Sequence, residues 1–150
     1  MKIDSADGSI VFAKGTISAG LSREDFLKSS LGPISKQRVM GGNWTHQDLE
    51  PESGIYCSVS FDDDRLDHVF ILMEHPSDEV DEQAEALELK RRSLHDAWLL
   101  KELGPPPYEY TWGRIASEYD NRGCVSEIII SYGVRTEPPR WWQERQPPES

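Results

Sequence analysis

The sequence predicts an α+β domain in which helices pack on one face of an antiparallel sheet. Three observations indicate this class. Short runs with apolar residues at alternate positions stand between turn signals, which is typical of antiparallel strands. Residues 78–103 carry apolar side chains at helical spacing. A helix followed by strands also occurs twice along the chain, which predicts a duplicated unit.

The bulk properties predict one domain. A chain of 150 residues is long enough to bury a core of its own. Its balance of 37% hydrophobic and 29% charged residues is ordinary for a globular protein. We expect an ordered domain over residues 1–137 and a C-terminal tail over residues 138–150, where Trp141 and Trp142 stand among prolines and charged residues.

The first half of the chain predicts one strand, one helix and a hairpin. Residues 8–14 are rich in β-branched and aromatic side chains and predict a strand. Ser22 is suited to cap a helix that ends at Gly32 and Pro33. The polar stretch around Gly41 and Gly42 is expected to be a connection. The remaining predicted elements are a short strand at 43–46 and a hairpin of strands 55–61 and 66–73 around a turn at 62–65.

The second half repeats this order with a longer helix. Ser77 is a suitable cap, and Gly104 with the prolines after it ends the helix. Trp98 is expected to be buried beneath the sheet. Residues 108–119 predict an aromatic-rich strand, 120–123 a turn and 124–132 a β-branched strand.

The two halves match in detail near each helix end. Phe26-Leu27 precedes Leu31-Gly32-Pro33 by the same spacing as Trp98-Leu99 precedes Leu103-Gly104-Pro105. We therefore expect half-repeats over about 21–73 and 94–132, although Leu-Gly-Pro is also a common helix ending. This tandem resembles the architecture of the β-lactamase inhibitor protein and of the small lipoprotein of the outer-membrane β-barrel assembly machine. The resemblance implies helices on one face of an antiparallel sheet whose other face binds proteins.

Residues for catalysis, metal or cofactor binding are not recognisable, so we expect a protein that is not an enzyme and has no cofactor. The glycines do not form a phosphate-binding loop. The histidines lack the spacing of zinc ligands, and Asp62 to Asp67 lacks the glycine and glutamate of a calcium loop. Cys57 and Cys124 are expected to be buried thiols. The alternative is a nucleophilic arrangement of either cysteine with His95 and Asp96.

A run of carboxylates precedes Lys90 without an intervening base, and it is either a solvated helix face or a surface that recognises a cationic partner. Outward-facing aromatic residues would add binding energy to such a surface. The candidate partner-binding residues are Asp78, Asp81, Glu82, Glu85, Glu88, Tyr110 and Trp112.

The net charge of −11 opposes binding to nucleic acid and to anionic membranes, since both are polyanionic, and favours a basic partner. The first residues lack the pattern of a secretory signal, and no apolar stretch is long enough to span a membrane. We therefore expect a cytoplasmic protein.

The phrases His95-Asp96-Ala97-Trp98-Leu99 and Ile128-Ile129-Ile130-Ser131-Tyr132 are similar to those of bacterial toxin-immunity proteins. That resemblance implies inhibition of a cognate toxin by stoichiometric binding, and a basic nuclease is one candidate for the toxin. Two alternatives remain open. One is a small ligand-binding domain or enzyme with a pocket between helices and sheet, and the other is a structural or adaptor subunit.

Overall fold

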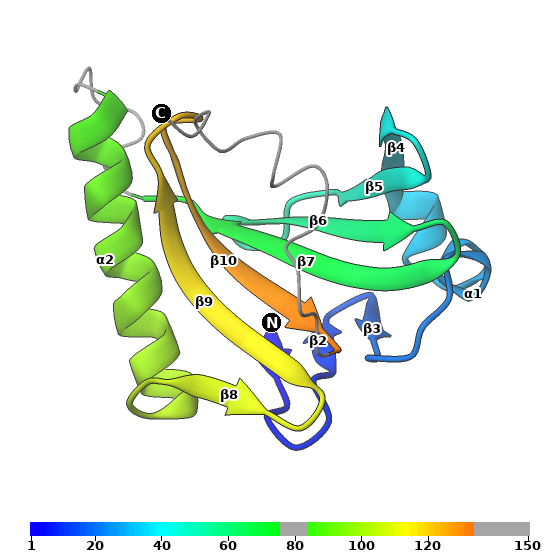
Figure 1. Cartoon of the computed structure of the whole chain (residues 1–150), viewed down its shortest axis with the longest axis horizontal. Coiled ribbons are helices and arrows are strands. Elements are labelled where there is room, and N and C mark those ends of the chain that lie inside the picture. Colours follow the sequence, from blue (N-terminus) through cyan, green and yellow to red (C-terminus); the bar gives the residue numbers. More distant parts are fainter. Residues whose placement is uncertain (76–83, 134–150) are drawn as a thin grey trace, which may run out of the picture.

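The computed structural model describes residues 1–75 and 84–133, which form two antiparallel sheets and two α-helices (Figure 1). The small sheet has the strand order β1-β2-β3, and the large sheet has the order β4-β5-β6-β7-β10-β9-β8. Every strand pair is antiparallel. The predicted α+β class with an antiparallel sheet is therefore confirmed.

The elements have the following bounds. The small sheet consists of β1 (Lys2–Ile3), β2 (Ile10–Phe12) and β3 (Gly15–Ile17). Two helices, α1 (Arg23–Lys28) and α2 (Ala84–Leu103), and a 3-10 turn, η1 (Gly32–Ile34), lie outside the sheets. The large sheet consists of β4 (Ser35–Gly41), β5 (Trp44–Leu49), β6 (Ile55–Asp62), β7 (Arg65–Met73), β8 (Tyr108–Tyr110), β9 (Gly113–Asp120) and β10 (Val125–Tyr132).

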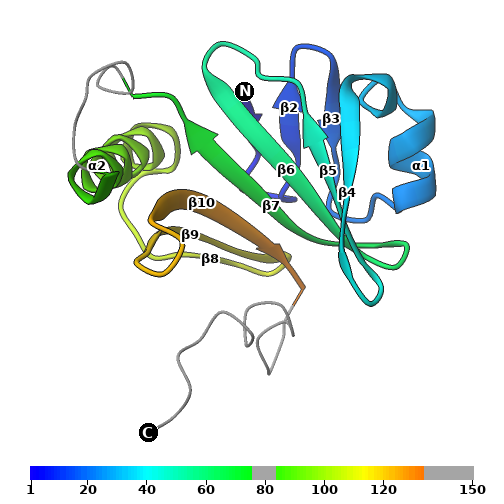
Figure 2. The ribbon, with the colours of Figure 1, turned by 90° about the horizontal axis from the view of Figure 1, so that it is seen from above.

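The core lies on one face of the large sheet, which we call the core face. Figure 2 shows α1 and α2 at the two ends of this sheet with the small sheet between them. On α1, the Phe26 ring packs on Phe61 of β6 at 5.6 Å between centroids, and on α2 Leu99 is buried. Ile10 and Ile17 of the small sheet are also fully buried in this core. The alternation of apolar residues along β6 and β10 arises because only one side of each strand faces this layer.

Two local predictions are confirmed. Residues 55–61 and 66–73 lie in the paired strands β6 and β7, with Ile55 opposite Met73. The pairing contains a bulge between Ser60 and Phe61. The hydroxyl of Ser22 accepts a hydrogen bond from the backbone N–H of Asp25 and caps α1, as its position before the helix predicted.

Other predictions need correction. The polar stretch before Gly41 is not a connection but strand β4. The single strand predicted at residues 108–119 is broken between β8 and β9. Trp98 is only half-buried, and its neighbour Leu99 occupies the interior instead. Cys124 is exposed in the turn before β10, whereas Cys57 is buried as predicted.

The predicted duplication and tail remain predictions. The first half of the chain supplies β4 to β7 as neighbours and the second half supplies β8 to β10, and the two groups join where β7 pairs with β10. The segment expected to begin the long helix falls partly on residues 76–83, and the expected tail falls on 138–150. Both stretches lie outside the described residues.

Candidate functional site

The large sheet ends at β4, and this edge strand is exposed along its length. Each residue from Lys36 to Gly41 is exposed, with Val39 at 72% and Met40 at 39%. In the described part of the chain, the backbone of these residues hydrogen-bonds to β5 alone. With no partner strand among residues 1–75 and 84–133, the outer row of N–H and C=O groups can pair with another strand. The opposite edge, β8, has only three residues.

The hairpin that carries β4 depends on two glycines. Gly41 and Gly42 have φ values of +106° and +56°, which glycine adopts without the steric cost that a side chain would add. The turn brings β4 back along β5, with Lys36 opposite Asp48 and Arg38 opposite His46. The side chains of Lys36, Arg38 and His46 therefore lie on the face of the sheet opposite the core face.

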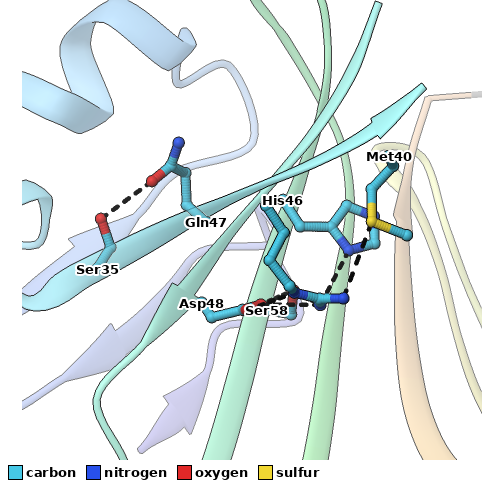
Figure 3. A network of polar contacts seen from close by, with 7 residues as sticks. Ser35, Met40, His46, Gln47, Asp48 and Ser58 are labelled. Atoms are coloured by element: carbon cyan, nitrogen blue, oxygen red, sulfur yellow. Dashed lines mark hydrogen bonds and ion pairs between the residues drawn. The ribbon is translucent and has the colours of Figure 1, made fainter. Parts of the chain in front are cut away.

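Arg38 at the centre of β4 belongs to a polar network with His46, Asp48 and Ser58, which are labelled in Figure 3. Its Nη2 donates to Oδ1 of Asp48 at 2.9 Å, and the Ser58 hydroxyl donates to the same oxygen at 2.7 Å. The hydrogen bond to Asp48 raises the pKa of Arg38. Burial opposes ionisation of Asp48, but hydrogen bonds from Arg38 and Ser58 outweigh it and lower its pKa. Arg38 and Asp48 therefore form an ion pair in which both groups stay charged.

Two further cations, one on β4 and one beside it, have no carboxylate partner among the described residues. Lys36 is exposed on the same face as Arg38. Arg23, the first residue of α1, donates through Nη2 to Oε1 of Gln37, whereas its buried Nε has no hydrogen-bond partner. Within residues 1–75 and 84–133, neither cation forms an ion pair. We call Arg23, Lys36, Val39 and Met40, together with the free backbone of β4, the β4 edge site.

The predicted acidic surface is only partly visible. Asp78, Asp81 and Glu82 lie outside the described residues, and Glu85 is exposed on α2. Glu88 is not a free surface group, since its Oε2 lies 3.0 Å from Nε of Arg91 and accepts the backbone N–H of Ser126 at 2.8 Å. Glu88 therefore fastens α2 to β10, which leaves it no free carboxylate for a partner.

Trp112, one of the two predicted aromatic residues, fastens the N-terminal segment to the large sheet. The rings of Tyr110 and Trp112 stack at 5.0 Å between centroids, and both side chains are half-buried. Nε1 of Trp112 donates to the backbone oxygen of Ser5 at 2.8 Å, and its ring lies against Gly8. The hydrogen bond joins residues 107 positions apart in the sequence, so sequence spacing did not indicate it.

Two of the groups considered for nucleophilic catalysis, Cys57 and His95, are protonated or engaged. Burial raises the pKa of the Cys57 thiol and keeps it protonated. Nε2 of His95 accepts the backbone N–H of Met73 at 3.0 Å. In the described ranges, no group of three or more His, Cys, Asp or Glu side chains is arranged to hold a metal ion.

A row of polar residues crosses the face opposite the core, and sequence pattern did not identify it. His46, Ser60 and His68 are paired across β5, β6 and β7. Phe70 packs on both histidine rings at 5.6 and 5.9 Å between centroids. Burial, and then repulsion by Arg114, lower the pKa of His68 to about 4, although Asp67 contacts its Nδ1. Only the strand register brings these residues together.

Comparison of the chain with protein-family models, with curated proteins and with solved structures gives no match. Among the described residues, the helices are too short or too polar to cross a membrane.

Proposed function

We propose that this chain is a protein-binding inhibitor, specifically a cytoplasmic immunity protein that neutralises a cognate bacterial toxin. The observation that carries the proposal is the β4 edge site. Soluble proteins usually shorten, cover, twist or charge an edge strand to prevent unwanted pairing, and β4 carries Lys36, Arg38 and a register shift between Val39 and Gly41. Here the edge is seven residues long, and Val39 and Met40 add exposed apolar surface beside the free backbone. Such a surface favours a protein partner.

The charge of the chain supports a basic toxin as the partner. The chain carries 27 acidic and 16 basic residues. A nuclease must attract nucleic acid, so its active-site cleft is generally basic, and the same field attracts an acidic inhibitor. Among the described residues, Glu85 and Asp63 are exposed and contribute to this field.

The test is whether this chain neutralises the protein encoded by the gene next to its own gene. That protein is expressed in a bacterial host with and without this chain, and growth is followed. We expect the chain to restore growth and to form a complex of fixed stoichiometry. Val39→Glu should abolish rescue, whereas Val11→Glu, at an exposed valine of the small sheet, should not. Growth arrest in the presence of the folded, soluble chain would contradict the proposal.

A further inference from the structure

We propose that the β4 edge site binds an extended acidic segment of the partner, which adds an eighth strand to the large sheet. The inference deepens the protein-binding function proposed above by naming the chemistry of the bound segment. It follows from three properties of the edge, namely its free backbone, its unpaired cations and its exposed apolar residues.

The backbone sets the geometry of binding. An added strand would lie about 4.8 Å from β4 and pair with its outer N–H and C=O groups. These hydrogen bonds are independent of sequence, so they provide affinity for any extended segment. Selectivity must then come from side chains, which alternate between the two faces of the sheet.

The cations select acidic residues. Lys36 lies on the face opposite the core, with Asp48 as its neighbour on β5. A carboxylate on the added strand would place Lys36 between two acids in neighbouring strands, which is a favourable cross-strand arrangement. Arg23 lies beside Gln37, whose side chain points to the core face. Two consecutive acidic residues in an extended segment would therefore reach Lys36 and Arg23 from opposite faces.

The remaining positions specify the rest of the segment. Arg38 is already neutralised by Asp48, so the residue opposite it should be uncharged. Val39 and Met40 follow, and each is exposed. Apolar residues opposite them would cover this surface. The expected segment thus has two acidic residues, one uncharged residue and two apolar residues, in either direction.

A second copy of this chain is disfavoured in two antiparallel registers of β4. In the antiparallel register that pairs β4 over its full length, Arg38 would face Arg38 of the other copy. In the register centred on Gln37, Lys36 would face Arg38. Like charges directly opposite each other destabilise a strand pair. The register centred on Val39 places Val39 opposite Val39 and Arg38 opposite Met40 without like charges, so self-association of the chain through β4 would overturn the inference.

Binding can be tested with peptides and the full isotope-labelled chain. The probes are two capped peptides, Ser-Glu-Glu-Thr-Val-Ile-Thr and the reverse sequence, with a third in which Lys replaces Glu. At up to about 2 mM peptide, we expect an acidic probe to shift amide resonances of β4 and Arg23 with a Kd of roughly 0.1–1 mM. The Lys peptide should bind at least about fivefold more weakly.

Charge variants identify the site. Lys36→Glu should weaken binding of the acidic peptide by about fivefold or more, the range expected of an exposed ion pair that becomes repulsive. Lys2→Glu, at another exposed strand lysine, should leave it unchanged. The inference is overturned if neither acidic peptide shifts β4, if the shifts fall on β8, or if Lys36→Glu has no effect.

The peptide experiment and the toxin assay test the two proposals separately. Peptide binding at β4 without neutralisation of the neighbouring protein would support the strand-addition inference and contradict the immunity function. Full neutralisation by the Lys36→Glu variant, without peptide binding, would support the immunity function and overturn the inference.

Discussion

At the scale of single residues, buried polar side chains of α2 satisfy the backbone hydrogen bonds of Met73 at the end of β7. His95 accepts the N–H of Met73, and Nη1 of Arg91 donates to the carbonyl oxygen of the same residue. A buried backbone group without a hydrogen-bond partner costs about 1–3 kcal/mol. The two side chains therefore supply the hydrogen bonds that a neighbouring strand would otherwise make to Met73.

His95 makes stability depend on pH. Burial, and then repulsion by Arg91, lower its pKa to about 4, although Asp96 and Glu88 oppose this shift. The unfolded chain has a histidine pKa of about 6.5, so it binds more protons than the folded chain below that pH. Stability should therefore fall as pH is lowered from about 6.5 to about 4. Urea unfolding at pH 7 and pH 5 should show a smaller loss for His95→Gln than for the unmodified chain, and equal losses would contradict this origin.

Leu99 should be the most sensitive apolar position of α2. It is buried, whereas the adjacent Leu100 is exposed. Leu99→Ala should lower the free energy of unfolding by about 2–5 kcal/mol, the range for a large buried side chain. Leu100→Ala should change it by less than about 0.5 kcal/mol. Denaturant titrations of both variants measure the difference, and similar values would show that the helix presents another face.

At the scale of elements, α2 is fastened to the sheet by polar contacts in addition to apolar packing. Glu88 contacts Arg91 on its own helix and the backbone of Ser126 on β10. The hydroxyl of Ser126 in turn donates to the backbone oxygen of Glu88. A pair of reciprocal hydrogen bonds thus fixes the position of the helix along β10.

Two glutamates of α2 should respond differently to substitution. Glu88→Ala would remove the carboxylate that contacts the buried Arg91 guanidinium and accepts the Ser126 N–H, and should destabilise the fold by about 1–3 kcal/mol. Glu85→Ala, one turn earlier and exposed, should cost less than about 0.5 kcal/mol. Thermal and denaturant unfolding distinguish the two, and a neutral Glu88→Ala variant would mean that this carboxylate is available to a partner after all.

Sequence pattern predicted the elements that have one buried face. The hairpin of β6 and β7 was recognisable because its apolar alternation is interrupted by acidic residues where the chain turns at Asp63 and Asp64. Strand β4 was missed because an exposed edge strand has no buried side to impose alternation. The engagement of Glu88 and Trp112 depends on contacts with residues distant in the sequence, which local pattern does not contain.

At the scale of the whole molecule, the small sheet is joined to the large one around Gly8. Trp112 lies against this glycine, and the hydroxyl of Tyr132 donates to its backbone oxygen at 2.9 Å. Burial raises the pKa of Tyr132, so the hydroxyl stays protonated and remains a donor. The N-terminal segment is thereby held against residues from the last strand of the described domain.

Gly8 should therefore tolerate no side chain. Its φ is +79°, and a Cβ there would lie 2.6 Å from the Trp112 ring. Gly8→Ala should destabilise the protein by about 1–3 kcal/mol because it combines backbone strain with overpacking. Gly20→Ala, where nothing lies within 4 Å of the added Cβ, should be nearly neutral. Equal melting temperatures for the two variants would mean that Trp112 can move away at little cost.

The pairing of β7 with β10 also determines how the chain behaves while it is being made. Ile71 lies opposite Ile128, so β7 is an interior strand only after the end of the domain has been synthesised. Until then, a nascent chain that has completed β7 presents its long apolar strand as an open edge, which is the kind of surface that promotes aggregation. Translation that pauses between Met73 and Val125 would prolong this exposure and should lower the yield of folded protein in a cell.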